Sequence, residues 1–331
     1  RIAWLIDTVG LSPWSIMAVT FTNKAAREMR SRIENLLSLN TEHLWVGTFH
    51  SLAHRLLRRH WQEAGLQQQF QIIDSDDQLS LLKRLCKEMQ LDEARWPVRQ
   101  FQSFINGCKD EGQRPQHIDT HGDFHLQTQV NVYAAYHQSC ERAGLVDFGE
   151  LLLRCHEMWL QNPALLAHYQ GRFKHILVDE FQDTNTIQYA WLRVLAGKSV
   201  YVMAVGDDDQ SIYGWRGAKI ENIQQFETDF DHTVNVRLEQ NYRSTGTILK
   251  AANGLISNNH GRLGKNLWTD GSDGEAISLY AAFNEMDEAR FIVDQINQWQ
   301  TTGGLRAECA ILYRSNAQSR VLEEALIRAN M

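Results

Sequence analysis

Two adjacent carboxylates follow a short hydrophobic run near the middle of the 331-residue chain. Asp179 and Glu180 come directly after Ile176–Val178. A strand that ends in two acids suits a nucleotide-hydrolysing site, because one acid can hold Mg²⁺ and the next can orient and deprotonate the attacking water. We interpret Asp179 as a metal ligand and Glu180 as a general base, although such a pair also ends many ordinary strands.

A second acidic loop supports this interpretation. Residues 206–210 (GDDDQ) follow another apolar run, at 200–205. Because parallel strands present their carboxyl ends at one edge of a sheet, we expect both acidic loops to lie on the same edge. The sequence thus predicts a cluster of polar groups there, around Asp179 and Glu180.

The segment after the second loop combines aromatic, glycine and arginine residues. Residues 211–217 (SIYGWRG) contain Tyr213, Trp215 and Arg216. Exposed Tyr and Trp side chains stack on unpaired bases without reading their sequence, and Arg adds a phosphate or cation–π contact. The segment therefore indicates binding of single-stranded nucleic acid, and the alternative is that Trp215 packs inside a tight loop.

The elements that carry these residues are typical of an α/β fold. Apolar runs rich in β-branched residues lie at 16–21, 45–48, 176–178 and 200–205, and they suit the buried strands of a parallel sheet. Helical segments follow them. Thr22 can cap the first, and Thr184 or Asn185 can open the one that ends at Gly197. This order predicts ligands at the carboxyl ends of the strands.

The pattern changes twice along the chain. Between residues 50 and 171 the strand signals almost vanish, which predicts an all-helical subdomain inserted into an α/β domain made of residues 1–49 and 172–237. A new α/β unit is expected over 238–331, with strands at 276–280 (AISLY) and 309–313 (CAILY) around a helix at 287–300.

Composition limits the function classes. No apolar run approaches the roughly 20 residues that cross a bilayer and no signal peptide is visible, so we expect a cytoplasmic protein. The five cysteines form no C-x-x-C pair, which argues against a zinc ribbon or a disulfide framework. A net charge of −7 argues weakly against nucleic acid, but basic clusters at residues 27–32 and 55–59 can override it locally, or can be solvated helix faces.

Six long motifs occur in the chain in a fixed order. They are 18–29 (AVTFTNKAAREM), 46–58 (VGTFHSLAHRLLR), 176–185 (ILVDEFQDTN), 205–218 (VGDDDQSIYGWRGA), 238–245 (LEQNYRST) and 310–320 (AILYRSNAQSR). These resemble motifs Ia, Ib, II, III, IV and IVa of the UvrD/Rep family of superfamily 1 DNA helicases. The resemblance implies a P-loop NTPase (RecA-like) motor domain with an inserted all-helical subdomain and the start of a second RecA-like domain.

The resemblance also implies an activity and its partners. The family consists of ATP-dependent 3′-to-5′ DNA helicases, which translocate on single-stranded DNA and act in DNA repair. ATP and Mg²⁺ are then the expected cofactors. Single-stranded DNA and junctions of single- and double-stranded DNA are the expected partners, bound independently of sequence at the nucleoid.

Roles at the nucleotide follow from the same resemblance. Asp179 resembles the Mg²⁺ ligand and Glu180 the catalytic base. Gln210 resembles the residue that senses the γ-phosphate and couples it to DNA. Tyr242 resembles the aromatic residue that stacks on adenine, and Arg243 the γ-phosphate arginine of the second motor domain.

Roles at the DNA follow in the same way. The base-stacking residues of the family correspond to Phe21, Tyr213 and Trp215. Contacts to the DNA backbone are implied for Thr48, His50 and Arg314, and further DNA contacts for Asn23 and Arg216. A motor that grips any sequence needs mainly stacking and phosphate contacts, in agreement with these residue types.

The chain departs from the family pattern in the motifs that it lacks. The phosphate-binding loop G-x-x-x-x-G-K-[ST] is absent, since Gly197-Lys198-Ser199 lacks the upstream Gly and Gly264-Lys265 is followed by Asn266. The family places that loop before this segment and motifs V and VI after it. We therefore expect an internal fragment that does not hydrolyse ATP by itself.

Two alternatives remain from the sequence alone. The parent protein is either an unwinding enzyme or a binding-only relative, and a helicase–nuclease would carry the same motor part. Metal ligation by histidines is disfavoured for two reasons. The pair His50 and His54 lacks the Glu of H-E-x-x-H, and the other three closely spaced histidines lie in residues 117–125, which the sequence predicts to be a loop.

Overall fold

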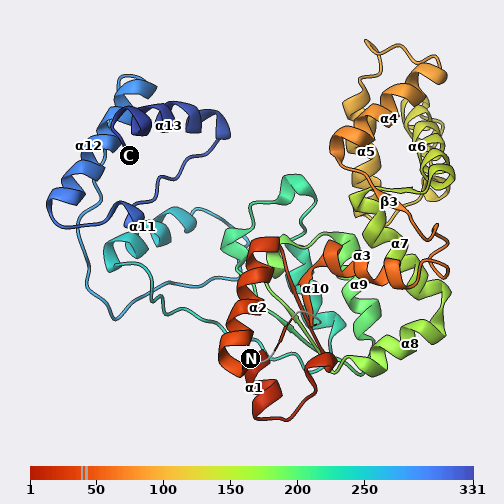
Figure 1. Ribbon diagram of the computed structural model, residues 1–331, viewed down its shortest axis with the longest axis horizontal. Helices are drawn as coiled ribbons and strands as arrows, with labels where there is room; N and C mark the ends of the chain where they lie inside the picture. The colour runs from red at the N-terminus through yellow and green to blue at the C-terminus, as the bar shows by residue number, and fades with distance from the viewer. Residues whose placement is uncertain (39, 42–43) are drawn as a thin grey trace. The chain divides into compact units, whose positions relative to one another are not determined.

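The computed structural model describes residues 1–331 except 39, 42 and 43 (Figure 1). The chain divides into two compact units. The first comprises Arg1–Val236 with Gly261–Leu263, and the second comprises Arg237–His260 with Gly264–Met331. None of the helices in the described part of the chain has the length and apolar character of a membrane span.

A four-stranded parallel sheet organises the first unit. Its strands are β1 (Ile16–Thr20), β2 (Trp45–Thr48), β5 (His175–Val178) and β6 (Tyr201–Ala204), in the order β2-β1-β5-β6. Every residue of β1 is buried, as expected for a central strand covered on both faces. The predicted α/β class and parallel sheet are confirmed.

Helices follow these strands, and three of them have side-chain caps at their starts. The helices are α2 (Asn23–Leu37), α3 (Phe49–Arg59), α9 (Thr186–Ala196) and α10 (Glu221–Asp229), preceded by the short α1 (Ile2–Asp7). The Thr22 hydroxyl accepts the Ala25 N–H, while Thr48 and Asn185 open α3 and α9 through capping boxes. Such caps satisfy the first free N–H groups of a helix and fix where it begins.

Residues between α3 and β5 form mostly helices. These are α4 (Ser75–Glu88), α5 (Val98–Asp110), α6 (Phe124–Ala143), α7 (Phe148–Gln161) and α8 (Pro163–Arg172). Helices α4, α5 and α6 lie together (Figure 1), and they share a core of their own around Leu82, Phe101 and Tyr133. Leu152 and Trp159 of α7 instead join the core of the sheet. Helix α7 therefore belongs to the core of the sheet, and it also contacts α5.

The helical part also contains a small parallel pair, β3 (Gln71–Ile72) with β4 (Leu145–Val146). The expectation of a wholly helical segment thus missed two strands. Strands of two residues show no alternation of apolar and polar positions, so the sequence pattern could not reveal them.

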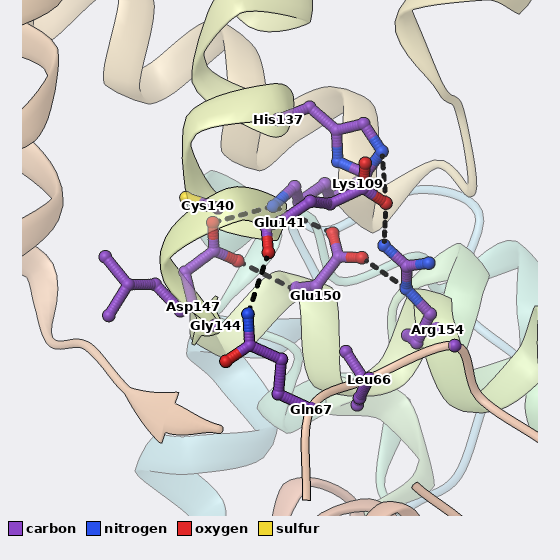
Figure 2. A pocket seen from close by; sticks show the side chains of 12 residues that line it. Leu66, Gln67, Lys109, His137, Cys140, Glu141, Gly144, Asp147, Glu150 and Arg154 are labelled. Atoms are coloured by element: carbon purple, nitrogen blue, oxygen red, sulfur yellow. Dashed lines mark hydrogen bonds and ion pairs between the residues drawn. The ribbon is translucent and has the colours of Figure 1, made fainter. Parts of the chain in front are cut away.

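A buried charge network joins α5, α6 and α7 (Figure 2). Lys109 Nζ lies 2.6 Å from an Asp147 carboxylate oxygen and 3.0 Å from one of Glu150. Arg114 donates to both carboxylate oxygens of Glu150 at 2.8 Å, and the Tyr136 hydroxyl donates to Asp147 at 2.7 Å. Burial alone would raise the pKa of Glu150, but Lys109 and Arg114 hold it well below its usual range. A network satisfied in this way fixes the three helices relative to one another.

The second unit contains α11 (Gly246–Ile256), α12 (Glu285–Thr301) and α13 (Ser319–Arg328). The strands expected at 276–280 and 309–313 are absent from the described residues, so this prediction was wrong. Leu279 and Leu312 are 98% and 94% exposed. A strand forms only when a neighbour pairs with its backbone, and neither segment has such a neighbour in this structure.

Candidate functional site

The carboxyl ends of β1, β5 and β6 lie side by side. The Asp179 N–H donates to the Val19 carbonyl at 2.8 Å, and the Phe181 N–H donates to the Val205 carbonyl at 3.0 Å. Both acidic loops therefore leave the same edge of the sheet, as the parallel arrangement predicts. Glu180 lies between these two bonds with a φ of +53°, a left-handed conformation that is uncommon for Glu. This turn carries its side chain to the exposed surface.

Gln182 links the two acidic loops. Its Nε2 donates to the Glu180 carboxylate at 2.7 Å, and its Oε1 accepts the Asp207 N–H at 3.0 Å. The Asp207 carboxylate in turn accepts Gln210 Nε2 at 2.6 Å. A continuous line of hydrogen bonds thus runs from Glu180 to Gln210. Our sequence reasoning missed Gln182, because only the folded structure places position 182 beside 207.

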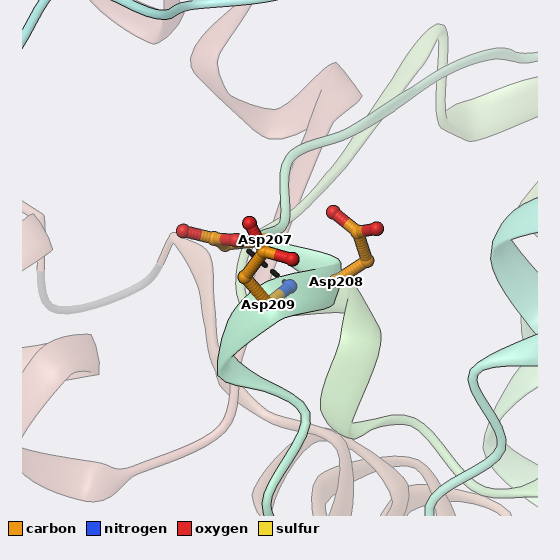
Figure 3. Close-up of side chains that lie close together, drawn as sticks. All are labelled: Asp207, Asp208 and Asp209. Carbon is orange, nitrogen blue, oxygen red and sulfur yellow. Dashed lines mark hydrogen bonds between the residues drawn. The ribbon is translucent and has the colours of Figure 1, made fainter. Parts of the chain in front are cut away.

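The three aspartates of the second loop lie close together (Figure 3). One carboxylate oxygen from each of Asp207, Asp208 and Asp209 lies within 4.8 Å of the others. Asp207 accepts the Asp209 N–H at 3.0 Å, and Arg262 forms two bonds to Asp209 at 2.7 and 2.5 Å. Hydrogen bonds and an ion pair therefore already engage this cluster.

The first loop contains carboxylates with raised pKa values. Burial and the neighbouring Glu180 raise the pKa of Asp179, and the same two causes raise the pKa of Asp183 to about 6. Asp183 Oδ1 is buried and has no hydrogen-bond partner among the described residues. Hard carboxylate oxygens suit Mg²⁺, and a nearby cation would favour their ionised form. The acids of this loop therefore fit a divalent cation.

Aromatic rings gather after the second acidic loop. The rings of Phe21 and Tyr213 are stacked, with centroids 5.0 Å apart and planes at 30°. The Arg216 guanidinium lies 5.3 Å from the Tyr213 ring centroid and 4.6 Å from that of Trp215. Trp215 is 73% exposed, so it does not pack inside a tight loop. The structure thus brings four of the predicted DNA-binding residues into one group, in which Trp215 and Arg216 are exposed and Phe21 and Tyr213 are half-buried.

Further predicted residues lie at the starts of α2 and α3, and the start of α3 contacts the start of α7. Asn23 is exposed at the first position of α2, and Thr48 caps α3. The His50 ring meets the Phe148 ring edge to face, with centroids 6.0 Å apart. Phe148 is 53% exposed although it is a large apolar residue. The sequence alone did not lead us to Phe148. The available signal was its position directly after Asp147, the residue that caps the helix.

The remaining predicted residues belong to the second unit. The Tyr242 ring is 86% exposed, and its hydroxyl donates to Gln240 Oε1 at 2.8 Å. The Asn241 side chain accepts the Arg243 N–H at 2.9 Å and so fixes the turn that presents this exposed arginine. Arg314 is also exposed. The roles of these residues at nucleotide and DNA stay predictions.

The basic clusters are partly structural. Arg30 Nε donates to the Val46 carbonyl at 3.1 Å, and the Arg55 guanidinium lies 4.3 Å from the Trp45 ring centroid. Arg58 lies 3.9 Å from the Phe70 ring centroid and donates to His54 Nε2 at 2.9 Å. These arginines support the packing of α2 and α3, in addition to any contact with phosphate.

Comparison with known proteins identifies the family. The model of the UvrD/REP helicase N-terminal domain matches residues 1–231, and that of the UvrD-like helicase C-terminal domain matches residues 236–331. The chain belongs to the UvrD/REP helicase family. It is 66% identical to DNA helicase II of Escherichia coli (strain K12) and 65% identical to that of Salmonella typhimurium, and 44% identical to the ATP-dependent DNA helicase PcrA of Staphylococcus aureus.

Each alignment covers 100% of this chain but 46% of the relative. The chain therefore spans about half the length of the curated relatives it matches. Experiments on activity accordingly concern the whole protein that contains this chain, and residues keep the numbers used here.

The environment of His50 leads to a prediction about pH. Burial lowers the pKa of His50 to about 4, so its ring stays neutral above about pH 5. We expect His50→Gln to weaken binding of single-stranded DNA by the same factor at about pH 8 and about pH 5.5. A histidine with an ordinary pKa of about 6.5 would gain a charge over this interval and bind phosphate more tightly at the lower pH.

The measurement is a titration of labelled DNA at both pH values. A larger difference in DNA affinity between wild type and variant at about pH 5.5 than at about pH 8 would contradict a neutral His50.

Proposed function

We propose that the protein containing this chain is an ATP-dependent DNA helicase that moves 3′ to 5′ along single-stranded DNA and acts in DNA repair. The relatives that match the chain are named DNA helicases. One structural observation carries the proposal: Glu180, Gln182, Asp207 and Gln210 form a continuous hydrogen-bonded line. This line begins at the acidic pair and ends three residues before Tyr213.

The acidic loop supports the hydrolytic half of this function. Glu180 is exposed at the edge of the sheet and is the candidate base that takes a proton from the attacking water. Asp179 is the candidate ligand of Mg²⁺, and Asp183 follows it four residues later in the same loop. When bound, Mg²⁺ would neutralise charge on the phosphate oxygens. Gln210 is positioned to report the state of the nucleotide, because its side chain is tied through Asp207 to the loop of Glu180.

The aromatic group supports the DNA-binding half. Trp215, Tyr213 and Phe21 offer ring faces that tolerate every base, and Arg216 adds a positive charge beside them. The half-buried His50 and the exposed Phe148 add a second candidate contact at the starts of α3 and α7. A shift of the acidic loop when nucleotide binds would move the segment that carries Tyr213 and Trp215. Cycles of ATP binding and release would then change the grip on DNA.

A strand-displacement assay tests the proposal. The full-length protein is mixed with a duplex that carries a single-stranded tail at either its 3′ or its 5′ end. We expect ATP-dependent displacement from the duplex with the 3′ tail and little from the other. Tight binding without displacement on either substrate would identify a binding-only protein, and preference for the 5′ tail would overturn the proposed direction.

The exposure of Trp215 leads to a prediction about affinity. Trp215→Ala in the full-length protein should weaken binding to oligo-dT and to mixed sequences alike, by about 5- to 150-fold, if the roughly 1–3 kcal/mol of base stacking is lost. Titrations at several salt concentrations should give an unchanged slope, because no phosphate contact is removed.

Trp4→Ala is the matched control, since Trp4 is a 45%-exposed tryptophan of α1. We expect it to leave DNA affinity unchanged. A Trp215→Ala variant that binds like wild type but melts at a lower temperature would show that the ring stabilises the fold instead.

A further inference from the structure

The carboxyl end of α5 lies between the two loops that the proposed function uses. Asn185 is the last residue of the segment that carries Asp179 and Glu180, and its Nδ2 donates to Asp110 Oδ1 at 2.8 Å. Asn185 also forms an antiparallel bridge with Ala218, directly after the aromatic loop. Asp110 therefore contacts the junction where the acidic loop and the aromatic loop meet.

Further contacts surround this junction. The Lys219 N–H donates to the Thr184 carbonyl at 2.9 Å, and Asn222 Nδ2 donates to the same carbonyl at 3.0 Å. A Cβ built on Gly217 would lie 3.6 Å from Asp110 Oδ2, in ordinary contact. The end of the aromatic loop therefore lies close enough to Asp110 that a methyl group at position 217 would touch its carboxylate.

The residue before Asp110 connects the junction to the other group of candidate DNA contacts. Lys109 pairs with Asp147 at 2.6 Å inside the buried network (Figure 2). Asp147 caps α7 by accepting the Glu150 N–H at 2.8 Å, and the helix begins with Phe148 beside His50. Adjacent residues of α5 therefore hold Phe148 on one side and the aromatic loop on the other.

We propose that Asp110 is a positioning residue that couples DNA bound at the aromatic loop to the acidic loop through its hydrogen bond to Asn185. The proposal rests on the proposed function, because it concerns the stimulation of ATP hydrolysis by DNA. Asp110 itself touches neither ligand in this assignment. The exposed pair of Glu111 and Lys219, 3.0 Å apart, accompanies the bond but is more screened by solvent.

The test measures ATP hydrolysis by the full-length protein with and without saturating oligo-dT. Asp110→Ala removes the acceptor of the Asn185 amide. Asn185→Ser removes the amide donor but keeps an oxygen that can cap α9, where Asn185 accepts the Gln188 N–H at 3.0 Å. We expect each variant to lower the DNA-stimulated turnover number by about 2- to 10-fold while the rate without DNA stays unchanged.

Two comparisons separate coupling from support of the fold. The double variant should lose no more than either single variant, because both changes remove the same bond. Asp110→Asn keeps an oxygen acceptor and should restore most of the stimulation. Three results would each overturn the positioning role. They are equal losses of ATP turnover with and without DNA, additive losses in the double variant, and failure of Asp110→Asn to restore stimulation by DNA.

The experiment also distinguishes this inference from the function on which it rests. Wild-type protein that shows no DNA-stimulated hydrolysis would overturn both. Wild-type protein that is stimulated, with Asp110→Ala and Asn185→Ser stimulated to the same extent, would overturn the coupling role alone. If Asp110→Ala melts at a markedly lower temperature, Asn185→Ser still decides the question.

Discussion

Glu180→Gln in the full-length protein should lower DNA-stimulated ATP hydrolysis by about 100- to 10,000-fold, the range that a positioned general base contributes. Gln has the shape of Glu but does not accept the proton of the attacking water. The side chain at this position lies beside Gln182 at the end of β5, and the turn that presents it is held by backbone bonds on both sides. The substitution should therefore leave the loop in place.

Binding and turnover should separate in this variant. We expect Mg²⁺–ATP to bind with nearly wild-type affinity, because the loss concerns a step after binding. Asp179→Asn should instead raise the Mg²⁺ concentration needed for half-maximal activity. The measurements are steady-state hydrolysis over a range of Mg²⁺ concentrations and equilibrium binding of a fluorescent ATP analogue.

Glu88→Gln supplies the same chemical change on the exposed surface of α4 and should leave turnover unchanged. If Glu180→Gln hydrolyses ATP at the wild-type rate, Glu180 is not the base. Asp183 is then the next candidate, because its raised pKa of about 6 suits a proton acceptor and it lies in the same loop. Asp183→Asn would test that assignment.

The sequence predicts the edge of the sheet well, for a local reason. Apolar runs such as 176–178 and 200–205 identify buried parallel strands, and the acids that follow them must leave at the carboxyl edge. The positions of Asp179 and of the loop at 206–210 were therefore predictable. The same reasoning failed at 276–280. A residue's β propensity depends on the local sequence, whereas a strand also needs a neighbouring strand that pairs with its backbone.

Contacts between distant residues left no signal in the sequence. Asp110 and Asn185 are 75 residues apart, and Lys109 and Asp147 are 38 apart. In the sequence, a single Asp at the end of a helix is expected to be solvated. Only the fold shows that an amide lies beside it. Gln182 was missed for the same reason, although it lies inside the motif at 176–185.

Arg243→Ala should separate catalysis from DNA binding more sharply than any other substitution in the second unit. An arginine that stabilises the charge of a transferring phosphoryl group accelerates hydrolysis by about 1,000- to 100,000-fold. The Arg243 side chain is exposed, and Asn241 fixes the turn that presents it, so its removal should leave the unit folded. We expect a loss of turnover in this range, with DNA affinity in the absence of nucleotide changed little.

Arg314→Ala is the matched control, because it removes another exposed arginine of the same unit, one that is proposed to contact the DNA backbone. This variant should weaken DNA binding. The slope of log affinity against log salt should fall by about 0.7, which is the value for one phosphate contact on a single strand. The turnover number at saturating DNA should stay near that of the wild type. The two arginines thus predict opposite patterns in the same two assays. The opposite result would be that Arg243→Ala lowers DNA affinity and the slope of that affinity against salt, and leaves ATP turnover intact. In that case Tyr242 and Arg243 belong to the DNA surface, and other residues must hold the nucleotide.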